Sequence, residues 1–113
     1  MSPVVYRGTR DDNGTARVTK QIDELAPVPL DMRNDIRNHS PTGPEWGYGG
    51  SGPAQLALAL LVDVLGEHDG ERLYQLYKRQ VVAGFSHEGF AITAEAIEEW
   101  ARGIEQGEHG TAE

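Results

Sequence analysis

The spacing of hydrophobic residues changes along the chain, and near the N-terminus it is typical of strands. Residues 4–10 begin with β-branched and aromatic side chains, and residues 15–22 alternate small or apolar side chains with polar ones. Asn13-Gly14 lies between the two segments and is a strong signal for a hairpin turn. The sequence therefore predicts two antiparallel strands joined as an N-terminal β-hairpin.

A nearly unbroken apolar segment in the middle of the chain predicts a helix. Between Gly52 and Gly66 only Gln55 and Asp63 are strongly polar. Ser51 or Gly52 is the expected N-cap, and Gly66 suits the left-handed residue that ends a helix. A helix that is apolar on nearly every face must be buried on nearly every side. We expect the helix of residues 53–65 to be central and covered by the other elements.

The remaining residues predict two more helices. Asp69 suits the N-cap of a helix over about 70–83, whose apolar residues have helical spacing. Residues 89–92 are compatible with a short third strand, and Thr93 suits the N-cap of a third helix. A polar tail, expected to fray, begins at Gly107. An N-terminal hairpin followed by about three helices is an α+β pattern.

The length of 113 residues fits one domain with a single core. We divide it into the hairpin (1–22), a long connection rich in glycine and proline (23–52), a helical part (53–106) and the tail (107–113). A connection of this length inside a compact domain is uncommon, and such segments often carry function.

The net charge of −8 comes entirely from one part of the chain. Residues 1–40 hold six Lys/Arg and six Asp/Glu, whereas residues 41–113 hold four and twelve. Binding to nucleic acid is disfavoured, because phosphate contacts require clustered cations. The longest apolar run, Leu56–Val62, is much shorter than the ~20 residues that span a bilayer. Without a signal peptide or any cysteine, the chain is expected to be cytoplasmic.

A glycine-rich segment leads directly into the apolar helix. A helix N-terminus exposes about four unpaired N–H groups and carries roughly half a positive charge. Glycines at 47, 49, 50 and 52 would let a ligand approach this backbone, and we expect a positive φ at Gly49 or Gly50. The segment lacks the Gly-Lys-[Ser/Thr] ending of a P-loop. The pattern predicts a cradle for a small anionic ligand or a peptide, with these candidate residues: Arg7, His39, Trp46, Tyr48, Gly49, Gly50, Ser51 and Gly52.

A plainer interpretation remains open for the same residues. The glycines can serve only to let the chain turn tightly and pack on the helix, with Trp46 and Tyr48 filling the core. Catalytic signals are weak. His39-Ser40 pairs a base with a nucleophile, but adjacent residues rarely adopt the needed geometry, and no acidic partner is evident. The four histidines lack the spacing of a helical zinc site, so we assign no metal, cofactor or catalytic residue.

Several stretches of the chain resemble a family of small uncharacterised proteins. They are Tyr6-Arg7-Gly8 and the long run His-Ser-Pro-Thr-Gly-x-Glu-Trp-Gly-Tyr-Gly-Gly-Ser-Gly-Pro-Ala-Gln-Leu-Ala-Leu-Ala-Leu-Leu at 39–61. The likeness continues to Trp100, and the chain departs from the pattern at Pro44, where an aromatic residue is expected. The family occurs in bacteria, haloarchaea, phages and plasmids. The resemblance implies no catalytic residue and favours a haloarchaeal or mobile-element origin.

Three functions remain for such a chain. The first is a non-enzymatic binding module that uses the 39–53 loop for a small anionic ligand or a peptide. The second is an acidic interaction or inhibitor protein of a virus or mobile element, which would meet a basic partner through the third helix. The third is a small hydrolase or transferase. The carboxylates that the second function would use are Glu95, Glu98, Glu99 and Glu105.

Overall fold

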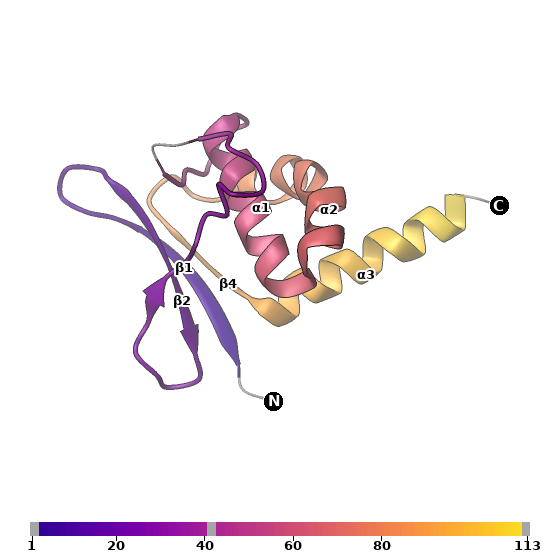
Figure 1. The fold of residues 1–113 in the computed structure, drawn as a ribbon, viewed down its shortest axis with the longest axis horizontal. Helices are drawn as coiled ribbons and strands as arrows, with labels where there is room; N and C mark the ends of the chain where they lie inside the picture. Colours follow the sequence, from indigo (N-terminus) through magenta and orange to yellow (C-terminus); the bar gives the residue numbers. More distant parts are fainter. Residues whose placement is uncertain (1–2, 41–42, 112–113) are drawn as a thin grey trace.

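The structure is a computed structural model that describes residues 3–40 and 43–111, with side chains to residue 106. It confirms the α+β class: a four-stranded antiparallel sheet, in the order β3-β2-β1-β4, packs with three helices (Figure 1). In chain order the elements are β1 (Val4–Arg10), β2 (Ala16–Ile22), β3 (Val28–Pro29), α1 (Ser51–Leu65), α2 (Glu67–Gln80), the 3₁₀ turn η1 (Val82–Gly84), β4 (Phe90–Thr93) and α3 (Ala94–Thr111).

The predicted hairpin is confirmed, and its turn shows why the sequence favours it. The Gly14 N–H donates to the Asp11 carbonyl at 2.9 Å, and Gly14 has a φ of +81°. The Asp11 carboxylate accepts the N–H groups of Asn13 and Thr15 at 2.9 and 3.0 Å. Glycine is suited to the positive φ and aspartate to the side-chain bonds, so the local sequence closes the hairpin by itself.

Of the other two strands, the sequence predicts β4 but not β3. The short third strand predicted at 89–92 exists as β4, which pairs antiparallel with β1 and sets Ile92 opposite Tyr6. Strand β3 was not predicted, because two residues carry no alternating pattern. Its Pro29 lies at the edge of the sheet, where the missing N–H breaks no ladder.

The predicted N-cap of α1 is wrong, whereas the predicted C-terminal end of the helix at Gly66 is confirmed. The N-cap is Gly50, whose carbonyl accepts the Ala54 N–H at 3.0 Å, so Ser51 and Gly52 lie inside the first turn. Among the described residues, no side chain caps this terminus. At the other end, Gly66 has the predicted positive φ, at +92°.

The predicted start of α2 is also wrong. Asp69 lies within the helix, and Gly66 serves as the C-cap of α1 and the N-cap of α2. One glycine thus reverses the chain between two helices and leaves no loop for Asp69 to cap. The helices approach closely at Gly70, where an added Cβ would lie 2.6 Å from Val62 Cγ2. Helix α2 ends at Gln80, and η1 follows where the sequence predicted a longer helix.

Helix α3 begins as predicted. The Thr93 hydroxyl accepts the Ala96 N–H at 3.0 Å, which is the bond of a helix N-cap. The helix continues to Thr111, past Gly107, where the polar tail was expected to begin. In Figure 1 its C-terminal part extends beyond α1 and α2. Within the described ranges, no helix is both long and apolar enough to cross a bilayer.

The expectation that the apolar helix is central is confirmed. Every residue of α1 from Gly52 to Val62 is buried. Large side chains from the other elements cover it, and each is no more than 1% exposed: Tyr6 from β1, Trp46 from the connection, Tyr77 from α2 and Ile97 from α3.

The polar residue Asp63 joins α1 to the sheet. Its Oδ2 accepts a hydrogen bond from the Tyr6 hydroxyl and pairs with Lys20 Nζ at 2.8 Å. Burial, together with the hydrogen bond to Asp63, raises the pKa of Tyr6 above its ordinary value. One carboxylate therefore holds two strands against the central helix.

We predict that Tyr77→Phe leaves the free energy of unfolding unchanged or raises it. The Tyr77 hydroxyl is buried and has no hydrogen-bond partner among the described residues, and such a group costs about 1–3 kcal/mol. Urea denaturation measures the change. The matched control is Tyr6→Phe, which removes a hydroxyl that has a partner and should destabilise the protein. Equal losses in the two variants would contradict the prediction.

Candidate functional site

One buried side chain fastens the long connection to α1. Gln55 is completely buried, and its Oε1 accepts the N–H groups of His39 and Ser40 at 2.8 and 3.2 Å. Its Nε2 donates to the Met32 carbonyl at 2.6 Å. Three backbone groups of an irregular segment thus find their partners on one amide. Gln55 fixes the point from which the glycine-rich segment starts.

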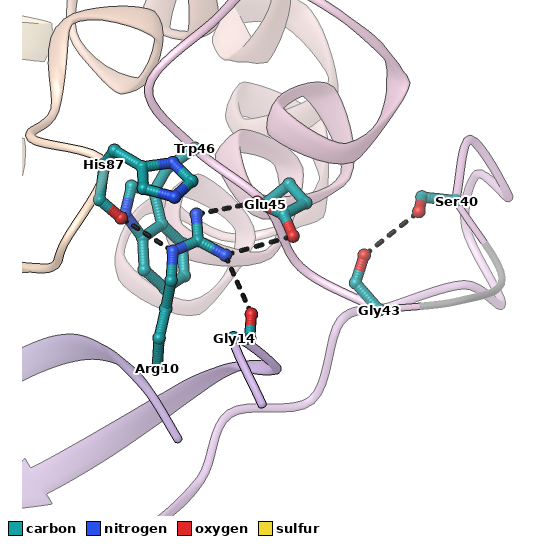
Figure 2. A network of polar contacts seen from close by, with 7 residues as sticks. All are labelled: Arg10, Gly14, Ser40, Gly43, Glu45, Trp46 and His87. Atoms are coloured by element: carbon teal, nitrogen blue, oxygen red, sulfur yellow. Dashed lines mark hydrogen bonds and ion pairs between the residues drawn. The ribbon is translucent and has the colours of Figure 1, made fainter. Parts of the chain in front are cut away.

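His39 and Ser40, considered above as a base and a nucleophile, have structural contacts instead. His39 Nε2 lies 2.7 Å from the Tyr74 hydroxyl, and the two rings are 5.6 Å apart. The Ser40 hydroxyl donates to the Gly43 carbonyl at 3.0 Å (Figure 2). Both residues hold the connection in place, His39 against α2 and Ser40 against the Gly43 carbonyl.

Trp46 fills the core, so the plainer interpretation is correct for this residue. Its side chain is fully buried and packs edge-on against Phe90, with 5.1 Å between ring centroids. Its Nε1 donates to the His87 carbonyl at 3.2 Å. The next residue, Gly47, donates its N–H to the Val82 carbonyl at 3.1 Å. Trp46 is therefore not available to stack on a ligand.

Arg10 clamps three segments together beside Trp46 (Figure 2). Its guanidinium donates two hydrogen bonds to the Glu45 carboxylate, at 3.2 and 2.8 Å, and lies 4.5 Å from the Trp46 ring centroid. Its Nε donates to the His87 carbonyl at 2.7 Å. The Arg10 hydrogen bond lowers the pKa of Glu45, and the same bond raises the pKa of Arg10. The clamp joins the hairpin, the connection and the segment before β4.

The arginine predicted for the site, Arg7, lies elsewhere. It is exposed and donates to Gln21 Oε1 at 2.7 Å. Successive residues of a strand face opposite sides of the sheet, and the buried residues of β1 are Tyr6 and Gly8. Arg10 shares their face and Arg7 does not. The strand predicted at 4–10 thus already implied, through the alternation of side chains along any strand, that Arg7 and Arg10 lie on opposite faces.

The expected positive φ at Gly49 or Gly50 is wrong. Gly47, at +87°, has the positive φ in this segment, and Gly50 is extended at 176°. Close approach does occur, but within the protein. A Cβ on Gly52 would lie 2.6 Å from Glu45 Cβ, and one on Gly50 would lie 2.9 Å from Tyr48 Cε2. The glycines let the side chains of the connection lie on the first turn of α1.

Part of the predicted cradle remains open. Tyr48 is 51% exposed, and Gly49 and Ser51 are also exposed. Among the described residues, the N–H groups of Ser51 and Gly52 have no hydrogen-bond partner. We call Tyr48, Gly49, Ser51 and the adjoining N-terminus of α1 the Tyr48 surface. In the residues that the structure covers, no cluster of three His, Cys, Asp or Glu side chains could hold a metal ion.

The fold and this site define a small α+β protein in which a long connection is fastened over the N-terminus of a buried helix. The chain belongs to the family described as Family of unknown function (DUF6166), whose model matches residues 6–103. Comparison with curated proteins and with solved structures found no match. The match covers nearly the whole chain, and the description of the family names no activity.

We predict that Gln55→Met destabilises the protein by at least about 1–3 kcal/mol, the cost of one buried polar group left unpaired. The substitution keeps the length of the side chain but removes the partner of Met32, His39 and Ser40. Urea denaturation measures the loss. Gln106→Met, at an exposed position of α3, is the control and should unfold like wild type. A Gln55→Met protein as stable as wild type would show that the connection is held by other contacts.

We also predict a pH-dependent role for Glu45. Because its pKa is lowered in the folded protein, its ionisation stabilises the fold above the unfolded pKa of about 4.3. This contribution is lost as the pH falls through the lower, folded pKa. Thermal unfolding should therefore show Glu45→Gln less stable than wild type near neutral pH, with the difference shrinking in acid.

The control for this experiment is Glu99→Gln, which removes an exposed carboxylate that has no ion pair in the described structure. It should match wild type at neutral pH. A Glu45→Gln deficit that stays constant down to strongly acidic pH would contradict a role for the carboxylate charge.

Proposed function

We propose that this protein is a non-enzymatic binding module, and that the Tyr48 surface takes a small anionic ligand or a peptide. The ligand's carboxylate or phosphate oxygens would accept a hydrogen bond from the N–H group of Ser51, which is an exposed residue, while Gly52 behind it is buried. Tyr48 would lie against the adjoining part of the ligand. Glycine at 49 leaves the backbone accessible from solvent.

The observation that carries the proposal is the uncapped N-terminus of α1. Most helices satisfy one of their first N–H groups with a side chain, but Gly50 has none to offer. Pro53 has no N–H, and Ala54 donates to Gly50, so the first-turn donors without a partner among the described residues are those of Ser51 and Gly52. The partial positive charge of a helix N-terminus favours an anionic acceptor at these donors.

Rigidity supports the same function. The body of α1 is buried on all sides, and Gln55 and Arg10 hold the connection that passes over its terminus. A site already held in its bound conformation binds with a smaller loss of conformational entropy. The charge of Glu45 is matched by Arg10, so an incoming anion does not meet an unpaired carboxylate at this place.

The acidic surface of α3 favours a second function, that of an acidic interaction or inhibitor protein. Glu95, Glu98 and Glu99 are exposed and have no ion pair in the described structure, whereas Glu105 pairs with Arg72 at 3.0 Å. Three free carboxylates on one helix suit a basic partner protein. A complex of this kind weakens strongly with added salt.

Backbone-amide NMR of the labelled protein tests the first function. Inorganic phosphate and, separately, a short peptide with a free C-terminal carboxylate are titrated to millimolar concentration. We expect shifts at Gly49, Ser51 and Gly52. Tyr48→Ala should weaken binding about fivefold to tenfold, which is roughly 1 kcal/mol and typical of a lost aromatic contact.

Two further variants separate this site from general anion binding. Ser51→Asp places a competing carboxylate in the first turn of α1 and should abolish the shifts. Arg7→Ala removes a cation on the other face of β1 and should bind like wild type. Absence of saturable shifts with both probes, or equal binding by Ser51→Asp, would overturn the proposal.

A further inference from the structure

Exposed hydrophobic side chains gather in one short segment far from the Tyr48 surface. Of the four large hydrophobic residues exposed in the described structure, three lie within residues 22–28: Ile22 at 40%, Leu25 at 65% and Val28 at 53%. We call residues 22–28 the apolar tip. It joins β2 to β3 and projects at the lower end of Figure 1, whereas the glycine-rich segment lies at the upper end.

Hydrogen bonds to its backbone hold the apolar tip, one of them within the tip and two to residues next to it. Asp23 has a φ of +56°, an unfavourable conformation for a residue other than glycine, and its N–H donates to the Pro3 carbonyl at 2.7 Å. The Leu25 N–H donates to the Ile22 carbonyl at 3.1 Å, and Gln21 Nε2 donates to the Leu25 carbonyl at 2.9 Å. The fold therefore presents Leu25 to solvent in a fixed position.

The charged side chains of the apolar tip itself are both acidic. A cation, Arg7, lies beside the tip, where it donates to Gln21 Oε1 at 2.7 Å and forms no ion pair with the tip among the described residues. Asp23 and Glu24 are exposed and take part in no ion pair among the described residues. Residues 21–30 contain no lysine or arginine. A surface that receives the apolar side chains must therefore also compensate two carboxylates.

We infer that the apolar tip is a docking knob for a partner protein whose apolar pocket is rimmed by lysine or arginine. Leu25 enters the pocket, with Ile22 and Val28 beside it, and the rim pairs with Asp23 and Glu24. A large apolar side chain seated in a desolvated pocket is the usual centre of binding energy in an interface. This surface is separate from the one proposed above, so either can fail without the other.

The same charges argue against two other occupants. In a symmetric dimer through the tip, the carboxylates of both copies would come together, and like charges at close range repel. The surface of a membrane with anionic lipids would repel them in the same way. A basic rim on a different protein satisfies the apolar and the charged groups together.

A photo-reactive leucine analogue at position 25 tests the inference in cells that naturally express the chain. Irradiation should yield a cross-link to one protein, identified by mass spectrometry, at a segment where apolar residues adjoin Lys or Arg. The same probe at position 48 is the control and should not give this cross-link. The identified protein is then purified, and its affinity is measured by calorimetry.

Affinity should fall at least about tenfold in Leu25→Ser and in a second variant, Val28→Ser, while Tyr48→Ser binds like wild type. Asp23→Asn with Glu24→Gln should weaken binding several-fold and reduce its salt dependence, since asparagine also accepts the positive φ. Circular dichroism checks that each variant is folded. The inference is overturned by a cross-link to a second copy or to lipid, or by no cross-link beyond the control. It is also overturned if the substitutions at residues 23–25 leave the affinity unchanged.

Discussion

The hydrogen bonds of Gln55 decide how the chain between the sheet and α1 is arranged. An irregular segment must still find partners for its buried N–H and C=O groups, and it has no ladder or helix to supply them. Here one amide of the central helix takes the N–H groups of His39 and Ser40 and the carbonyl of Met32. The path of the following residues, and with it the position of Trp46 in the core, starts from this anchor.

The glycines before α1 serve the same arrangement. The connection returns over the first turn of the helix so closely that the stem of Glu45 occupies the space a Cβ at Gly52 would need. This approach allows Glu45 to reach Arg10 on β1, whose guanidinium lies over the Trp46 ring. A glycine-rich segment therefore adjoins the most apolar helix because the segment lies so close to the first turn of the helix that a Cβ at Gly52 would not fit.

The sequence predicted most of the elements and the burial of α1, but not the contacts between segments far apart in the chain. The hairpin, the apolar helix and the Thr93 cap depend on neighbouring residues, and all three are confirmed. The Asp69 cap is wrong because Gly66 alone makes the turn between two helices. The sequence shows Gln55 as a polar residue in an apolar segment. Its hydrogen-bond partners could not be predicted, because they depend on how the preceding connection folds back onto α1.

The choice between Arg7 and Arg10 shows how a site can be misread when residue type is considered without strand geometry. Both are cations of β1, but the buried Tyr6 and Gly8 already define the inner face, and only Arg10 lies on it. Its guanidinium donates hydrogen bonds within the protein, to the Glu45 carboxylate and the His87 carbonyl. Groups that hold the fold in this way are poor candidates for recognition. The groups that we propose for binding are instead held by the fold and have no partner among the described residues: the first N–H groups of α1, the carboxylates of Glu95, Glu98 and Glu99, and the side chains of the apolar tip.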